Sequence, residues 1–360
     1  MSEMAERAPS SVALESWPSP LRTVSGAPVP ALAFGLGTRH RHVSDDVTAN
    51  ALRAALHAGF RHIDCARFYG TEAIAGRVLA EGLVPRRELF LTSKLWMTHH
   101  DDAGVAESVN ASLAALGLEY LDMLLIHWPV AWTRDSDPAD KARGVTPRAD
   151  VPLVATWRAM ERLVAAGRVR ALGVSNCGVA ELDEILGSDP AVRPTINQVE
   201  CHPQCAQTAL RDACAARGVR LACFGPLWPQ RAAAEGGGGG AAAGSARVVA
   251  ACAAAAAAHG RSTTQVLLRW LIQRACMPVT TSSNPERVRQ SFGALDFTLT
   301  DAEMAAIDDA GARAPFRRYN PLGWREPPDA LWFAPDDIDA SESRPSQAQS
   351  AGSPRVVLNS

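Results

Sequence analysis

One local pattern recurs along this chain: an amphipathic helix, a glycine, one or two further residues and then a short apolar strand. It leads through Gly59 into Phe60–Asp64, and it returns around Gly117, Gly167 and Gly218. A glycine just past a helix end adopts the left-handed conformation without Cβ strain, so these positions predict helix C-termini. Eight segments have the character of strands: 31–37, 60–64, 89–94, 121–127, 169–174, 195–199, 219–224 and 277–281.

The segments between the strands have helical periodicity. One helix face carries Val105, Val109, Leu113 and Leu116, and another carries Leu153, Trp157, Met160 and Val164. A helix between consecutive strands requires a parallel crossover, and eight such units in one domain predict an α/β fold, the (β/α)8 TIM barrel. The alternative is a doubly wound sheet, which needs a glycine-rich phosphate turn after its first strand. Gly35-Leu36-Gly37-Thr38 lacks a third glycine at that spacing, so we favour the barrel.

The two ends of the chain differ in composition from its middle. We expect residues 1–20 to form a disordered N-terminal extension, 21–335 the barrel, and 336–360 a disordered tail rich in Ser, Pro, Gln and Gly. Within the barrel, residues 232–246 contain five consecutive glycines and predict a flexible Gly/Ala-rich loop. The alanine-rich segment Val248–Ala258 predicts a helix.

Charge and hydropathy exclude several classes of partner. The net charge is only −2 and there is no basic run, which argues against nucleic acid and anionic membranes. No apolar run is long enough to span a bilayer. The polar, acidic start lacks the features of a signal peptide, so we expect a cytoplasmic protein, and a monomer.

The chain has eight cysteines, which in a reducing compartment are free thiols rather than a disulfide framework. Cys201-His202-Pro203-Gln204-Cys205 has the residue types of a metal site. No second Cys/His pair stands at a zinc-site spacing, and we therefore predict no metal site.

Polar side chains stand at the predicted strand ends, which converge at the C-terminal mouth of a barrel. Asp64, Lys94 and His127 end the second, third and fourth strands, and Tyr69 lies on the loop after the second. Four more residues fall at or just past the ends of strands five to eight: Ser175, Gln198, Phe224 and Thr281. Taken singly, each such group is most often a loop or capping residue, and His62 is predicted to be structural.

Together the four groups suit the acid catalysis that the reduction of a carbonyl group needs. A Tyr has a pKa of about 10, and a Lys ammonium roughly 4 Å away favours its phenolate by on the order of 4 kcal/mol, which lowers that pKa. Asp64 can compensate for the buried charge of Lys94. His127 can donate a hydrogen bond to the carbonyl oxygen that Tyr69 protonates. A hydride is then missing, and it implies a nicotinamide cofactor.

The sequence motifs GFRHID, LTSKLW and LIHWP around these four groups resemble those of the aldo-keto reductases. The resemblance covers about residues 21–325. The resemblance implies that Tyr69 is the general acid, that Lys94 and Asp64 tune it, and that His127 orients the carbonyl. Trp96 and Trp128 are then expected to wall the substrate pocket. Arg39 stands where many members place an aromatic pocket residue, which favours a polar or anionic substrate.

The same resemblance implies a set of cofactor contacts. Gly173-Val174-Ser175-Asn176 resembles the segment that binds the nicotinamide carboxamide, and Asn197-Gln198-Val199-Glu200 supplies Gln198 to it. Phe224-Gly225-Pro226-Leu227 resembles an aromatic-Ser-Pro-Leu word whose ring stacks on the nicotinamide, with Gly225 in place of the Ser. Three further cofactor residues are implied: Gly37, Thr38 and Leu227.

Residues 280–287 resemble the stretch that holds the adenosine 2′-phosphate, with Arg287 as its phosphate-binding arginine. Thr281 stands where many members have a lysine, while Thr281 and Ser282 keep hydroxyls. Gln290 and Ser291 stand where the family's Glu and Asn touch adenine. We expect NADP as the cofactor, with NAD possible.

These inferences predict an NADP-dependent oxidoreductase that reduces an aldehyde or ketone, a small-molecule carbonyl substrate, to an alcohol by hydride transfer from NADPH. An alternative is a non-catalytic, cofactor-binding regulatory subunit on the same barrel. A barrel hydrolase or isomerase is a third hypothesis, and it would need paired carboxylates or a metal set at the mouth.

Overall fold

The computed structural model describes residues 22–23, 26, 28–37, 40, 43–136, 146–148, 150–235 and 240–318. The predicted extension at 1–20 and the predicted tail at 336–360 lie outside the described residues. So do residues 319–335 of the predicted barrel, together with Thr38 and Arg39.

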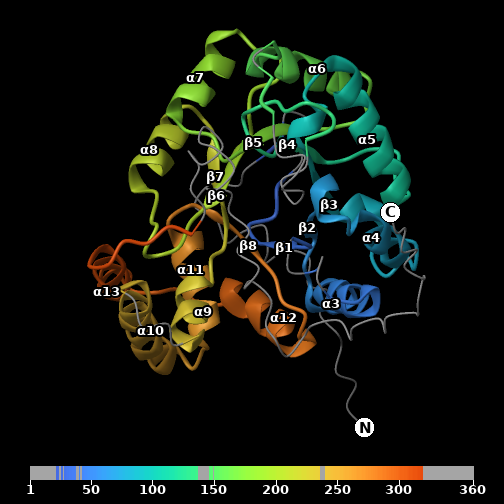
Figure 1. Ribbon diagram of the computed structural model, residues 1–360. Helices are drawn as coiled ribbons and strands as arrows, with labels where there is room; N and C mark the ends of the chain where they lie inside the picture. Colours follow the sequence, from blue (N-terminus) through green and yellow to red (C-terminus); the bar gives the residue numbers. More distant parts are fainter. Residues whose placement is uncertain are drawn as a thin grey trace, which may run out of the picture.

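Eight parallel strands close into a barrel in sequence order, with the last strand paired to the first (Figure 1). The strands are β1 (Ala33–Gly35), β2 (His62–Asp64), β3 (Phe90–Leu95), β4 (Met123–Ile126), β5 (Leu172–Ser175), β6 (Ile196–Glu200), β7 (Arg220–Phe224) and β8 (Met277–Thr280). Each overlaps one of the eight predicted segments, with β3, β5 and β6 ending one residue later than predicted, and the (β/α)8 fold is confirmed.

Helices surround the barrel (Figure 1). They are α3 (Asp45–Ala58), α4 (Glu72–Leu79), α5 (Asp102–Leu116), α6 (Leu153–Ala165), α7 (Val179–Gly187), α8 (Thr208–Ala216), α9 (Trp228–Glu235), α10 (Gly240–His259), α11 (Thr263–Gln273), α12 (Pro285–Phe292) and α13 (Asp301–Ala312). The described residues also form four short 3-10 helices: η1 (Arg67–Tyr69), η2 (Arg86–Glu88), η3 (Met97–His99) and η4 (Gly293–Leu295).

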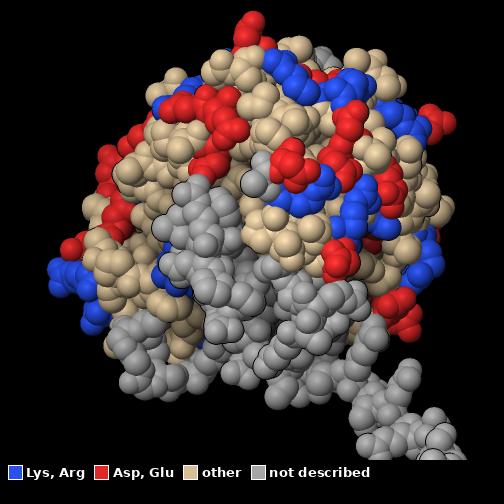
Figure 2. Space-filling model, turned by 45° about the horizontal axis from the view of Figure 1, so that its top comes forward, with Lys and Arg blue, Asp and Glu red and all other residues tan. Residues whose placement is uncertain are grey.

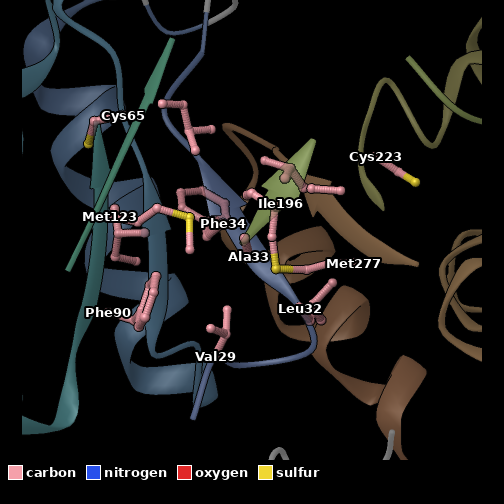
Figure 3. Packing of buried hydrophobic residues seen from close by; sticks show 14 of the residues in the cluster. Val29, Leu32, Ala33, Phe34, Cys65, Phe90, Met123, Ile196, Cys223 and Met277 are labelled. Carbon is pink, nitrogen blue, oxygen red and sulfur yellow. The ribbon is translucent and has the colours of Figure 1, made fainter. Parts of the chain in front are cut away.

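The predicted apolar helix faces pack on the barrel and form one continuous core with the strands. The four apolar residues predicted on α5 are all buried. On α6, Leu153, Trp157 and Met160 are buried, and the Trp157 indole donates a hydrogen bond to the Val192 carbonyl at 3.0 Å. Figure 3 shows part of this core, with side chains from β1, β3, β4, β6 and β8. This packing makes the barrel a rigid frame for the residues at its mouth.

The recurring glycines end the helices as predicted. Gly59 follows α3 with φ 108°, and Gly117, Gly167 and Gly218 have φ values of 66°, 71° and 72°. At Gly59 a second constraint applies, because an added Cβ would lie 2.7 Å from the Phe292 ring of α12. Gly59 therefore lets α3 end and lets α12 approach it.

Gly59→Ala is expected to lower the free energy of unfolding by about 2–4 kcal/mol, from left-handed strain and from the clash with Phe292. Gly117→Ala is the matched control, since its Cβ would meet nothing within 4 Å and only the strain of about 1–2 kcal/mol remains. Urea unfolding measures both. Equal losses in the two variants would contradict a role for the Phe292 contact.

The segment 232–246 differs from its prediction as a flexible loop. Residues 232–235 belong to α9 and residues 240–246 to α10, so the prediction is wrong for both parts, while 236–239 lie outside the described residues. The alanines of this segment are strong helix formers, and packing outweighs the cost of its glycines. At Gly244, a Cβ would stand only 2.4 Å from the Cβ of Ala314. The predicted helix at Val248–Ala258 is confirmed as part of α10.

The surface and the cysteines carry few special features. On the face drawn in Figure 2, acidic and basic side chains of the described residues are interspersed with uncharged ones. None of the helices formed by the described residues is both long and apolar enough to cross a bilayer.

All eight cysteines are free thiols, and all except Cys205 are buried. The described residues bring together no group of three or more metal-ligating side chains.

Candidate active site

Four polar side chains lie at the C-terminal mouth of the barrel. Asp64 ends β2, Lys94 is the penultimate residue of β3, and His127 directly follows β4. Tyr69 ends η1, the short helix between β2 and α4. The parallel pairing of β2 with β3 and of β3 with β4 brings the three strand ends together.

Lys94 and Asp64 form a buried ion pair at this mouth. The Lys94 ammonium also donates a hydrogen bond to the Cys65 carbonyl at 2.9 Å, and the Gln198 amide donates to Asp64 Oδ2 at 2.8 Å. Burial opposes the charge of Lys94, but the attraction of Asp64 and Tyr69 outweighs it and raises the pKa of Lys94. Lys94 is therefore a fixed cation at neutral pH.

Tyr69 lies between this cation and His127. The Lys94 Nζ atom is 5.0 Å from the centroid of the Tyr69 ring. The Tyr69 hydroxyl is 3.5 Å from His127 Nε2, and the two rings are perpendicular. The phenol and the imidazole thus approach the same point, where one oxygen atom of a bound molecule can accept from both.

His127 is uncharged at this site. Burial, and then the positive charge of Lys94, hold its pKa well below the usual 6.5. Its backbone carbonyl accepts a hydrogen bond from the Asn176 amide at 3.0 Å. A neutral imidazole has one donor and one acceptor nitrogen, so His127 can donate a hydrogen bond without acting as an acid.

An aromatic wall adjoins the four polar groups. Phe68 stacks on Trp96 with 3.9 Å between ring centroids, and Trp96 and His127 form an edge-to-face pair with their centroids 5.1 Å apart. Trp132 packs against Trp96, and Trp128 is buried in the same cluster. Sequence reasoning singled out Trp96 and Trp128 but missed Phe68 and Trp132. Phe68 could have been found from its position directly before Tyr69.

His62 is structural, as predicted. It is fully buried in β2, two residues before Asp64, and its Nε2 atom lies 2.8 Å from the Thr92 hydroxyl. Burial lowers its pKa to about 4, so it carries no charge near neutrality.

The next strand ends carry several of the predicted cofactor residues. The Ser175 hydroxyl donates to the Gln198 carbonyl at 2.7 Å, and the Asn176 amide also reaches Ser175 Oγ at 3.1 Å. Asn176 has φ 58°, a left-handed conformation that asparagine tolerates better than most residues. Phe224 ends β7 half-buried, followed by Gly225 with φ 64°. Ser175, Asn176 and Gln198 therefore form one bonded group beside His127.

The start of α12 lies beyond β8. Asn284 caps the helix by accepting from the Glu286 and Arg287 amides, and the exposed Arg287 side chain forms no ion pair with a described residue. The Thr281 hydroxyl lies 2.9 Å from Nε2 of the buried His40. His40 was not singled out in the sequence, because nothing local links it to Thr281.

Four further predicted cofactor residues can be placed. Gln290 is exposed on α12, whereas Ser291 is buried and its hydroxyl donates to the Arg287 carbonyl at 2.8 Å. The proton of the Ser291 hydroxyl is therefore used within the helix. Gly37 follows β1 beside the mouth, where a Cβ would be 3.9 Å from the Tyr69 ring. Leu227 is partly buried and packs on the core.

The model of the aldo/keto reductase family matches residues 31–312 of this sequence. The chain belongs to the aldo/keto reductase family. It is 42% identical over 264 residues to mouse aldo-keto reductase family 1 member A1, covering 72% of this chain and 80% of the relative. It is 39% identical over 288 residues to an aldo/keto reductase of Synechocystis, covering 79% and 86%.

Solved aldo-keto reductase structures share its fold. A Bombyx mori aldo-keto reductase in complex with NADP superposes with a TM-score of 0.74 at 30% identity, covering 87% of this chain and 98% of the other. The aldose reductase of Schistosoma japonicum superposes with a TM-score of 0.73 at 28% identity, covering 84% and 95%.

Proposed function

We propose that this aldo/keto reductase reduces an aldehyde or ketone to an alcohol with NADPH, and that Tyr69 is the general acid. One observation carries the proposal: the Tyr69 hydroxyl and His127 Nε2 lie 3.5 Å apart beside the buried Lys94–Asp64 pair. His127, as a hydrogen-bond donor, and Tyr69, as an acid, can therefore both act on one carbonyl oxygen.

Each residue then has one task. His127 donates its Nε2 proton in a hydrogen bond to the carbonyl oxygen and polarises the carbonyl group. Tyr69 transfers its proton to the same oxygen, and Lys94 stabilises the phenolate that remains. Asp64 holds Lys94 in place and offsets the cost of burying its charge. When bound, a nicotinamide cofactor supplies the hydride that the carbonyl carbon accepts and that no side chain can provide.

The chain has residues suited to that cofactor along the mouth from β5 to β8. Ser175, Asn176 and Gln198 offer hydroxyl and amide groups for a carboxamide, and Phe224 offers a ring for stacking. The exposed guanidinium of Arg287 at the start of α12 suits a phosphate, which favours NADPH over NADH. Because Thr281 bonds His40 and carries no charge, we expect this preference to depend mainly on Arg287.

Arg287→Ala is expected to weaken NADPH binding about 10- to 100-fold, because a charge-assisted hydrogen bond to phosphate is lost, while NADH binding changes little. The control is Arg289→Ala on the same helix, since Arg289 already pairs with Glu286 at 2.6 Å. Fluorescence titration with both cofactors measures the constants. An equal loss for NADH and NADPH in Arg287→Ala would contradict a 2′-phosphate contact.

The proposed activity is tested by a panel of aromatic, aliphatic and anionic aldehydes and ketones, assayed in parallel with NADPH and NADH. We expect turnover with NADPH, strongest for aromatic carbonyls that pack on the wall of Phe68 and Trp96. Cofactor binding without oxidation across the whole panel would reject the function.

A further inference from the structure

Three buried polar atoms on the connections after β3 and β4 have no hydrogen-bond partner among the described residues. They are Nδ1 of His127, Nε2 of His100 and Nε1 of Trp132. The three residues are only 7%, 2% and 2% exposed. Buried polar groups are nearly always bonded, to protein or to ordered water, because leaving one unsatisfied costs about 1–3 kcal/mol. Three such atoms in one region therefore point to a bound molecule.

The three residues share one neighbourhood. The Trp96 ring packs edge-to-face with two rings, that of His127 with 5.1 Å between centroids and that of Trp132 with 5.8 Å. His100 directly follows η3, whose first residue, Met97, accepts a hydrogen bond from the Trp132 amide at 2.8 Å. His100 is also near enough to influence the charge of His127. The connection after β3 and the connection after β4 thus meet beside the His127 ring.

The hydrogen-bonding chemistry of the three atoms is complementary. The Trp132 indole can only donate. If His127 donates Nε2–H toward the mouth, its Nδ1 atom is an acceptor. Burial lowers the pKa of His100 to about 3, so its neutral ring can offer either a donor or an acceptor at Nε2. A buried water typically makes about three hydrogen bonds, and these three partners suit one.

We propose that His100 and Trp132 hold one buried water molecule against Nδ1 of His127, and that the bond from this water keeps the His127 proton on Nε2. The inference deepens the proposed function, since it concerns the donor that polarises the carbonyl. His100 is then a positioning residue that acts through His127 and does not touch the substrate.

The test compares two His100 variants in the full-length protein. His100→Leu removes the bond at similar volume, whereas the amide of His100→Gln keeps a polar group near the position of Nε2. ¹⁵N NMR of the histidine side chains, recorded without cofactor, reports which nitrogen of His127 carries the proton. We expect wild type and His100→Gln to hold it on Nε2, and His100→Leu to populate the Nδ1–H form.

Kinetics supply the second readout. His100→Leu is expected to lower kcat roughly tenfold or more with the NADPH dissociation constant unchanged, and His100→Gln to recover most of it. His99→Gln is the matched control, because His99 is the adjacent, partly exposed histidine and bonds Thr98. An unchanged His127 tautomer in His100→Leu would overturn the inference even if activity fell.

Trp132→Phe provides an independent variant, because it keeps an aromatic ring and removes only the indole donor. It is expected to shift the His127 tautomer in the same direction, and it carries the test if His100→Leu fails to fold. The NMR readout does not depend on turnover. A wild-type protein with the predicted tautomer but no carbonyl reduction would therefore reject the proposed function and leave the water site standing.

Discussion

Tyr69→Phe should lower kcat for carbonyl reduction by about 10²- to 10⁴-fold, the usual contribution of a positioned acid. The substitution removes the hydroxyl that lies 3.5 Å from His127 Nε2 and keeps the ring near Lys94. Because no ring contact is lost, the dissociation constant for NADPH should change by less than a factor of about two, a small effect on the scale of a lost hydrogen bond. Stopped-flow reduction and a fluorescence titration measure the two quantities separately.

The control for this variant is Tyr120→Phe. Tyr120 precedes β4 at the opposite end of the barrel, where its ring lies between the guanidinium groups of Arg86 and Arg170. The Tyr120 hydroxyl takes no part in the proposed chemistry, so the kcat of Tyr120→Phe should match that of the wild type. Wild-type turnover in Tyr69→Phe would reject Tyr69 as the acid, whatever the control does.

Asp64→Ala should lower the free energy of unfolding by about 3–5 kcal/mol and abolish most activity. Lys94 is fully buried, and without Asp64 its charge keeps, among the residues that the structure describes, only the Cys65 carbonyl as a hydrogen-bond partner. Breaking one side of a buried ion pair costs far more than the pair contributes in the intact protein. The exposed pair of Arg53 and Glu81 is the control, and Glu81→Ala should cost much less.

The double variant Asp64→Ala/Lys94→Met separates stability from chemistry. Removing both charges should recover much of the lost stability, because no unpaired ammonium remains in the core. Activity should stay low, since nothing then stabilises the Tyr69 phenolate. Urea unfolding and steady-state assays on the same preparations supply both readouts. A double variant no more stable than Asp64→Ala would contradict the assignment of the loss to the buried charge.

The barrel was predictable from the sequence because its unit repeats. Each helix, glycine and strand is encoded over a few neighbouring residues, and the left-handed glycines after α3 and α5 mark where one unit turns into the next. Asp64, Lys94 and His127 could be found for the same reason. In a parallel barrel, a polar residue at the C-terminal end of a strand lies at the mouth, and this position does not depend on contacts with distant parts of the chain.

Contacts between residues distant in sequence could not be predicted in this way. The bond from His40 to Thr281 and the packing of Phe68 on Trp96 depend on how separate connections meet at the mouth. Residues 232–246 were predicted as a flexible loop from their five consecutive glycines, which also lower helix propensity. That cost is offset where Gly244 allows α10 to approach Ala314, a contact that composition does not encode.

The most direct test of the proposed chemistry follows the hydride itself. The wild-type protein is mixed with NADPH that carries deuterium at both positions of nicotinamide C4 and with a substrate found in the carbonyl panel, and the alcohol product is analysed by mass spectrometry and NMR. We predict that deuterium appears on the former carbonyl carbon, one per NADPH consumed, and that Tyr69→Phe forms almost none. NADPH that binds but leaves no deuterium in any product would contradict catalysis and favour a cofactor-binding regulatory role.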